Sequence, residues 1–146
     1  MQTTLSAHRG ADRGRHAAAG TSSVTTPRMR IIGRTLMGFL SLFLLFDGGA
    51  RAVGFAPYVE GTVQAGYPAS YGVGIGVLLI VPTALYLLPR TAVLGAILLT
   101  GYLGAAVASN LRVGLSFVFP LVFGMLVWGA LYLLDGRLRE MIPVRR

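Results

Sequence analysis

The sequence predicts an all-α, polytopic membrane protein: a four-transmembrane-helix bundle with a short interfacial helix between the first and second spans. The chain of 146 residues is 54% hydrophobic and only 12% charged, and its mean hydropathy is +0.68. Such a chain has too little polar surface to cover a soluble globule. After residue 30, four apolar segments each approach the length of about 20 residues that a helix needs to cross a hydrocarbon core.

Residues 1–30 are rich in Ala, Gly, Ser, Thr and Arg and show no sustained apolar periodicity. This composition predicts a disordered basic N-terminal tail. Two interpretations of the tail stay open. It can act as a basic arm held against anionic lipid, or it is either a plain spacer or an over-extended start, with true translation initiation at Met29.

The predicted transmembrane domain covers residues 31–134, and its first span covers residues 31–53. Arg34 lies one turn inside this span, from where its guanidinium can reach the headgroups. The uncharged stretch 35–46 followed by Ala50-Arg51-Ala52 is similar to a signal peptide with its cleavage site. Asp47 and the long preceding region favour an uncleaved first helix.

The segment 54–69 is the predicted interfacial helix. Glu60, Gln64 and Tyr67 recur at i, i+4 and i+7, so we expect these polar groups to share one side of the helix. The apolar side chains left to contact the membrane are those of Val59 and Val63.

The other three predicted spans cover residues 70–88, 91–109 and 115–134, and a short basic C-terminal tail covers residues 135–146. The second span contains a GxxxG pattern at Gly72 and Gly76, which permits close helix contact, and Pro82, which predicts a kink. Only Pro89 and Arg90 connect the second and third spans, so these helices are expected to be antiparallel neighbours.

The distribution of charge predicts the topology. Four spans place both termini and the Arg90 turn on one side of the membrane, and eleven of the thirteen basic residues fall there. The acidic and basic residues of the other side cancel, so the net charge of +8 lies entirely on the first side. By the positive-inside rule that side is cytoplasmic, which predicts a multi-pass protein of the cell inner membrane. The arginines flank spans, which argues against nucleic acid as a partner.

The residue inventory argues against catalysis by this chain. It has no cysteine, which excludes thiol chemistry and iron–sulfur ligation. Its two histidines, His8 and His16, both lie in the N-terminal tail. We therefore expect no catalytic residue, no cofactor and no metal site, and a protein that is not an enzyme.

A polar cluster is predicted at the outer mouth of the bundle. Asp47 and Arg51 have the spacing and order of a helical ion pair, and the topology brings Glu60, Gln64 and Arg112 to the same level. Carboxylates and arginines can bind a polar headgroup, a quinone carbonyl or a small anion. The alternative is that Asp47 and Arg51 only neutralise each other and hold the first helix to its neighbours.

The chain resembles the DoxX-like family of four-helix membrane proteins over about residues 31–143. The resemblance lies in the segments Leu45-Phe-Asp-Gly-Gly-Ala-Arg51, Gly66-Tyr-Pro68, Pro89 to Ala108, Asn110-Leu-Arg112 and Trp128 to Leu133. Arg51 occupies a place near the end of the first helix where the family often has a basic residue. The resemblance implies association with membrane oxidoreductases or oxidative-stress complexes; some relatives look like subunits of quinone-linked sulfur oxidoreductases.

Two functions are therefore expected. The first is a noncatalytic subunit or assembly/anchor factor of a membrane redox-related complex, with the lipid bilayer and a membrane oxidoreductase or a homo-oligomer as partners. The second is a small-molecule binder or carrier for a quinone- or lipid-like ligand, held by the polar cluster.

Overall fold

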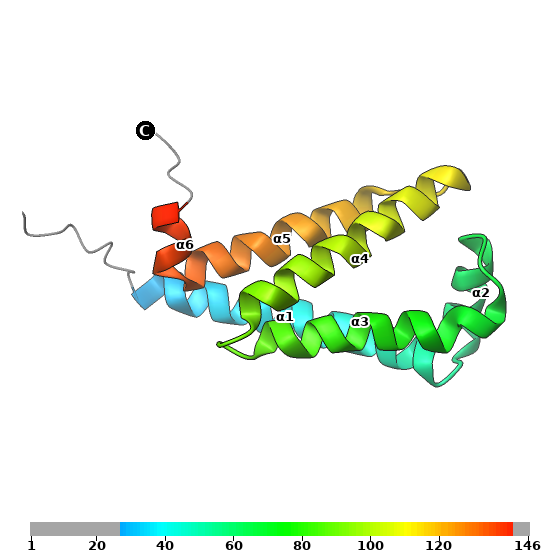
Figure 1. The fold of residues 1–146 in the computed structure, drawn as a ribbon, viewed down its shortest axis with the longest axis horizontal. Helices are drawn as coiled ribbons and strands as arrows, with labels where there is room; N and C mark the ends of the chain where they lie inside the picture. Colours follow the sequence, from blue (N-terminus) through cyan, green and yellow to red (C-terminus); the bar gives the residue numbers. More distant parts are fainter. Residues whose placement is uncertain (1–26, 142–146) are drawn as a thin grey trace, which may run out of the picture.

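The computed structural model describes residues 27–141, and within that range every regular element is a helix. Four long helices and three short ones follow one another along the chain (Figure 1). Their bounds are α1 Pro27–Ala52, α2 Ala56–Gln64, the 3-10 turn η1 Ala69–Tyr71, α3 Gly72–Leu87, α4 Ala92–Arg112, α5 Val118–Leu134 and α6 Gly136–Met141. The all-α prediction is confirmed for these residues.

The long helices correspond to the four predicted spans, with shifted ends. α1 includes residues 27–30, which precede the predicted start at residue 31. α4 continues through Arg112, and α5 starts only at Val118. Between them Gly114 adopts a positive φ of 72°. Residues 1–26 and 142–146 lie outside the described residues. Most of the predicted N-terminal tail and the end of the predicted C-terminal tail therefore lie outside them too.

The long helices form a ring in which each packs on two others. α1 contacts α3 and α5, and α4 contacts the same two helices. α1 and α4 lie diagonally opposite, with no close backbone approach between them. This arrangement confirms that the helices before and after the Arg90 turn are antiparallel neighbours (Figure 1).

Glycines allow the closest helix contacts in the ring. A Cβ on Gly76 of α3 would lie 2.5 Å from the carbonyl oxygen of Gly48 on α1, which is far inside van der Waals contact. On the other side of α3, a Cβ on Gly95 of α4 would collide with the backbone of Tyr86. The backbone of α3 therefore lies in direct contact with the backbone of α1 and, near the turn, with that of α4.

The apolar core lies at the end of the bundle that contains the Arg90 turn and α6. Leu40, Leu79, Leu99 and Val127 are at most 1% exposed, one from each long helix. Tyr86 is also fully buried, and its hydroxyl donates a 2.8 Å hydrogen bond across the bundle to the Val127 carbonyl. The diagonal bond ties α3 to α5 through the centre of the core.

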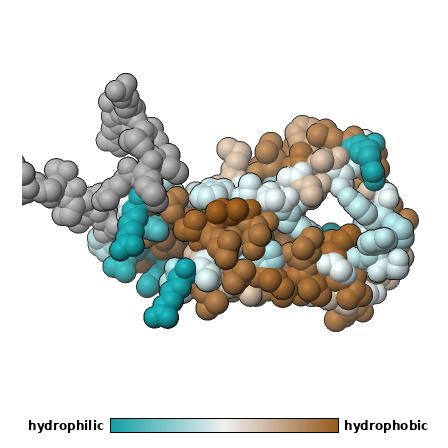
Figure 2. Space-filling view, viewed as in Figure 1, coloured by the Kyte–Doolittle hydropathy of each residue, from teal (hydrophilic) through white to brown (hydrophobic). Residues whose placement is uncertain are grey.

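The outside of the bundle is apolar over most of its length. Side chains such as Phe39, Leu42 and Met125 are between 64% and 70% exposed, and Figure 2 shows hydrophobic residues over the visible face with hydrophilic ones toward its ends. Three helices, Pro27–Ala52, Ala69–Leu87 and Ala92–Arg112, are long and apolar enough to cross a membrane. α5 is equally apolar but has 17 residues, or about 26 Å of helix.

The bundle opens at the end opposite the core. α3 and α4 leave their connecting turn close together and diverge toward the end where α2 lies (Figure 1). The short helix α2 packs on α1, η1 and α3 but has no close backbone contact with α4. The space between α3 and α4 is the candidate site.

Candidate functional site

A cavity of about 760 Å³ lies between α3 and α4 and beneath α2. It is open to the surface, and Figure 2 shows the molecule hollowed at this place. Its lining residues come from α1, α2, the segment after α2, η1 and the two diverging helices: Arg51, Thr62, Ala65, Tyr67, Pro68, Tyr71, Ile75, Leu78, Pro82, Ile97, Leu98, Gly101, Tyr102, Ala105, Ala106, Ser109 and Asn110.

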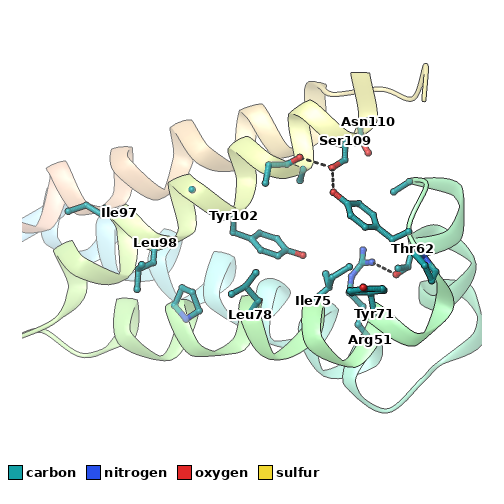
Figure 3. Close-up of a pocket in the computed structure, with 17 residues that line it drawn as sticks. Arg51, Thr62, Tyr71, Ile75, Leu78, Ile97, Leu98, Tyr102, Ser109 and Asn110 are labelled. Atoms are coloured by element: carbon teal, nitrogen blue, oxygen red, sulfur yellow. Dashed lines mark hydrogen bonds between the residues drawn. The ribbon is translucent and has the colours of Figure 1, made fainter. Parts of the chain in front are cut away.

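The polarity of the lining changes along the cavity. Toward the core, Leu78 of α3 lies opposite Leu98 of α4 (Figure 3), and Ile75, Pro82 and Ile97 complete the apolar lining. Toward α2 the lining carries a guanidinium, hydroxyls and an amide (Figure 3). The cavity is therefore amphipathic along its length.

Arg51 is the one charged side chain of the lining. Its Nε donates to Oδ2 of Asp47 at 3.2 Å, and its Nη2 donates to Oδ1 of the same carboxylate at 3.5 Å. The Arg51 and Asp47 side chains are 22% and 19% exposed, respectively. The predicted helical ion pair is confirmed, and it sits at the last turn of α1, beside the cavity.

The same guanidinium fixes α2 over the end of the cavity. Nη1 of Arg51 donates to Oγ1 of Thr62 at 3.0 Å, and Oγ1 of Thr62 donates in turn to the carbonyl of Tyr58 at 2.9 Å. The guanidinium also lies 5.6 Å from the centroid of the Tyr58 ring, within cation–π range. Thr62 is 1% exposed, so this contact is the buried underside of α2.

A second set of contacts bridges the outer rim. The hydroxyls of Tyr67 and Ser109 are 2.8 Å apart, and Ser109 donates its proton to the Ala105 carbonyl. Tyr67 is therefore the donor of the bridging bond. The Arg112 guanidinium lies 6.0 Å from the centroid of the Tyr67 ring. These contacts connect the segment after α2 to the end of α4 across the mouth of the cavity.

Tyr102 projects from α4 into the middle of the cavity, with its hydroxyl directed toward the end that holds Arg51 (Figure 3). No protein hydrogen bond is recorded for this hydroxyl within residues 27–141. Thr83 and Thr100, by contrast, donate to the carbonyls of Leu79 and Ala96, whereas the buried Ser41 hydroxyl of α1 has no partner among the described residues. Tyr86 likewise donates to the Val127 carbonyl, so the hydroxyls of Thr83, Tyr86 and Thr100 differ from that of Tyr102.

The five predicted ligand residues do not form one cluster. Arg51 lines the cavity and Asp47 sits behind it as its partner. Arg112 lies at the rim, stacked on Tyr67. Glu60 and Gln64 turn away and line a separate shallow hollow of about 380 Å³ together with two valines.

The predicted shared side of the segment 54–69 holds for Glu60 and Gln64 but is wrong for Tyr67. Glu60 and Gln64 share their surface with Val59 and Val63. α2 ends at Gln64, and Gly66 with a φ of 85° turns the chain before Tyr67. Tyr67 consequently leaves the helix and faces α4, because the i+7 spacing applies only while the helix continues.

Sequence reasoning missed Thr62 as a site residue and gave no role to Tyr102 or Ser109. Thr62 has a weak signal in the sequence, since it follows Tyr58 by one helical turn within the segment that contains Glu60. Tyr102 and Ser109 are seven residues apart, on one face of the third predicted span, but nothing in the sequence marks that face as the wall of a cavity. Their importance depends on the divergence of α3 and α4, which has no local sequence signal.

The family match covers most of the helical bundle and most of the residues around the cavity. The sequence pattern of the DoxX-like family matches residues 35–130, about two thirds of the chain, and this segment contains both walls of the cavity and the Asp47–Arg51 pair. The chain belongs to the DoxX-like family. It is accordingly a membrane protein with transmembrane helices. No curated protein and no solved structure matches this DoxX-like chain.

The polar end of the cavity offers hydrogen-bond donors. Arg51 has five N–H groups, of which three are directed at Asp47 and Thr62. Two N–H groups remain for a ligand. The residues described in the structure include no group of three or more His, Cys, Asp or Glu side chains that could hold a metal ion.

Proposed function

We propose that this DoxX-like protein is a noncatalytic membrane protein that binds a small amphipathic molecule, lipid- or quinone-like, in the cavity between α3 and α4. The observation that carries the proposal is an open cavity of about 760 Å³ with apolar walls and a single cation at one end. Pockets for small molecules have volumes of about 300–1,000 Å³ and combine apolar walls with a few polar groups that fix orientation.

The polar end of the cavity is prepared for a ligand without rearrangement. Asp47, Thr62 and the Tyr58 ring hold the Arg51 guanidinium in one place. A donor that is already fixed loses little side-chain entropy when a ligand binds. The ligand's polar group then belongs beside Arg51, and its apolar part lies between Leu78 and Ile97.

The proposed setting is the cell inner membrane, crossed four times with both termini in the cytoplasm. The charge asymmetry of the sequence supports this orientation. α5 supports a fourth crossing because it packs along α1 and α4 and is apolar throughout. In this orientation α2 lies at the outer interface and the Arg51 end of the cavity faces outward.

The orientation predicts a labelling pattern. The chain has no cysteine, so a single introduced cysteine can be labelled without background from other thiols of the protein. Ser70 lies at the α2 end of the bundle and Leu88 lies in the turn after α3, and both residues are exposed. Each is replaced by cysteine in a separate variant. A membrane-impermeant maleimide should label Ser70→Cys in intact spheroplasts and Leu88→Cys only after permeabilisation. The reverse pattern would contradict the orientation, and labelling of both before permeabilisation would contradict the crossing between them.

Native mass spectrometry of the protein extracted gently from its own membrane tests the binding function. The wild-type protein should retain a small molecule. Arg51→Ala should retain at most about a tenth as much of it, since hydrogen bonds to a charged group contribute about 1.5–3 kcal/mol. Arg137→Ala is the control, because Arg137 is an exposed arginine of α6 outside the cavity lining. Equal retention by Arg51→Ala and wild type, with both folded, would contradict the proposal.

A noncatalytic subunit or anchor of a membrane redox-related complex is the second candidate. Gly104 and Ala108 are exposed on α4, and a Cβ on Gly104 would meet nothing within 4 Å. Such a surface lets another helix approach closely. A stoichiometric membrane oxidoreductase in the same spectra would favour this role, and a homo-oligomer or a free monomer would count against it.

A further inference from the structure

We infer that the cavity selects an uncharged amphiphile whose polar end is a hydrogen-bond acceptor such as a carbonyl, and that it discriminates against amphiphiles with a full negative charge. The inference rests on the proposed binding function and names the class of ligand. It follows from how the charge of Arg51 is balanced and from which donors remain free.

The carboxylate of Asp47 already neutralises the one cation of the cavity. Asp47 contacts Arg51 through both carboxylate oxygens, at 3.2 and 3.5 Å, from outside the lining. An uncharged acceptor placed against Arg51 leaves the site neutral. An anion at the same place leaves a net negative charge beside apolar walls, and an uncompensated charge out of water is costly.

The free donors suit a carbonyl oxygen. Arg51 retains two N–H groups after its bonds to Asp47 and Thr62. The Tyr102 hydroxyl is directed into the same part of the cavity (Figure 3). A carbonyl oxygen has two lone pairs, so it can accept from Arg51 and from Tyr102 together. An ammonium headgroup has no acceptor and would face a guanidinium.

The apolar walls of the cavity can hold the long apolar part of a ligand that enters from the bilayer. The lining of α4 runs from Ile97 to Asn110, about 20 Å along a helix. Leu78 and Ile97 line the cavity and are nevertheless 61% and 53% exposed. The cavity is therefore open on the apolar flank of the bundle, where lipid surrounds a membrane protein, and a hydrophobic molecule can pass between α3 and α4 without crossing water.

Matched photoreactive probes test the inference. Two probes share one palmitoyl-length chain with a diazirine near its end; one carries a methyl ester and the other an alkyl sulfonate, which is ionised at every working pH. Each is incorporated at equal density into nanodiscs that hold the full chain, and crosslinked peptides are quantified. We expect the ester to label peptides of α3 and α4 around Leu78 and Ile97 about tenfold more than the sulfonate, equivalent to 1.4 kcal/mol.

Asp47→Asn should shift the preference toward the sulfonate, because the amide keeps the shape of the side chain but leaves the charge of Arg51 unbalanced. Arg137→Gln is the control, since this exposed arginine of α6 lies outside the lining, and its ester-to-sulfonate ratio should match the wild type. If Asp47→Asn does not accumulate, the wild-type ratio alone decides the inference.

The outcomes separate the inference from the proposed function. Labelling of the cavity by sulfonate at least equal to that by ester would overturn the selection for uncharged ligands and leave a binding cavity in place. An unchanged ratio in a folded Asp47→Asn protein would overturn the role of Asp47. Labelling spread over the outer surface, with no enrichment at the cavity by either probe, would overturn the binding function itself.

Discussion

Gly76→Ala is expected to destabilise the bundle by about 2 kcal/mol or more, at the upper part of the range for overpacked cores. The new methyl group would lie 2.5 Å from the carbonyl oxygen of Gly48 and 2.8 Å from the amide nitrogen of Ala52. Both are backbone atoms, so no side-chain rotation relieves the clash and α1 must move away from α3. Thermal unfolding of the purified protein in detergent measures the loss.

The matched control is Gly74→Ala, two residues away in the same helix. A Cβ there meets nothing within 4 Å, and alanine is favoured over glycine inside a helix by about 1 kcal/mol. Gly74→Ala should therefore be as stable as the wild type or slightly more stable. If both variants unfold at the same temperature, the close α1–α3 contact at Gly76 does not exist.

Gly101→Trp should abolish retention of the small molecule, with a loss of about tenfold or more in bound amphiphile, while the protein stays folded. Gly101 lines the cavity, and a Cβ added to it meets nothing within 4 Å. The indole can therefore occupy the space between α3 and α4 without displacing backbone. Native mass spectrometry and photolabelling with the ester probe both measure the loss.

Gly104→Trp is the control for the filled cavity. Gly104 lies one turn further along α4, and an added Cβ there is equally free of neighbours, but the residue does not line the cavity. The Gly104→Trp variant should retain the ligand. Retention by Gly101→Trp, or equal loss in both variants, would show that the ligand binds elsewhere.

The helices could be predicted from the sequence because their signals are local. Apolar length identified four helical segments, and the two-residue connection at Pro89 and Arg90 identified α3 and α4 as antiparallel neighbours. The i, i+4 spacing of Asp47 and Arg51 identified the ion pair. Each of these depends on residues that are close together in the chain.

The cavity could not be predicted because it depends on packing between distant segments. Gly95 brings α4 against the backbone of Tyr86 near the turn, and the helices diverge beyond it toward α2 (Figure 1). Neither the closeness at one end nor the opening at the other follows from the hydropathy of α3 or α4. For this reason, no sequence feature distinguishes the Tyr102 hydroxyl from the other hydroxyls of the predicted spans.

The outer polar cluster was predicted only in part for a similar reason. The topology places Glu60, Gln64 and Arg112 at one level of the bundle, but level alone does not determine the side of α2 from which a residue projects. Thr62 turns inward to Arg51 at 3.0 Å, and the two longer polar residues turn outward. A helix of nine residues has too few apolar positions to specify its rotation by pattern.

The most direct test of the central claim is an experimental structure of the wild-type protein in nanodiscs made with its own membrane lipids, by cryo-electron microscopy with a bound fiducial. The cavity between α3 and α4 should contain an elongated density that no protein atom explains, with its polar end within hydrogen-bond distance of Arg51 and Tyr102. A structure in which α4 closes against α3 along its whole length, with Tyr102 bonded to protein and no such density, would contradict the account.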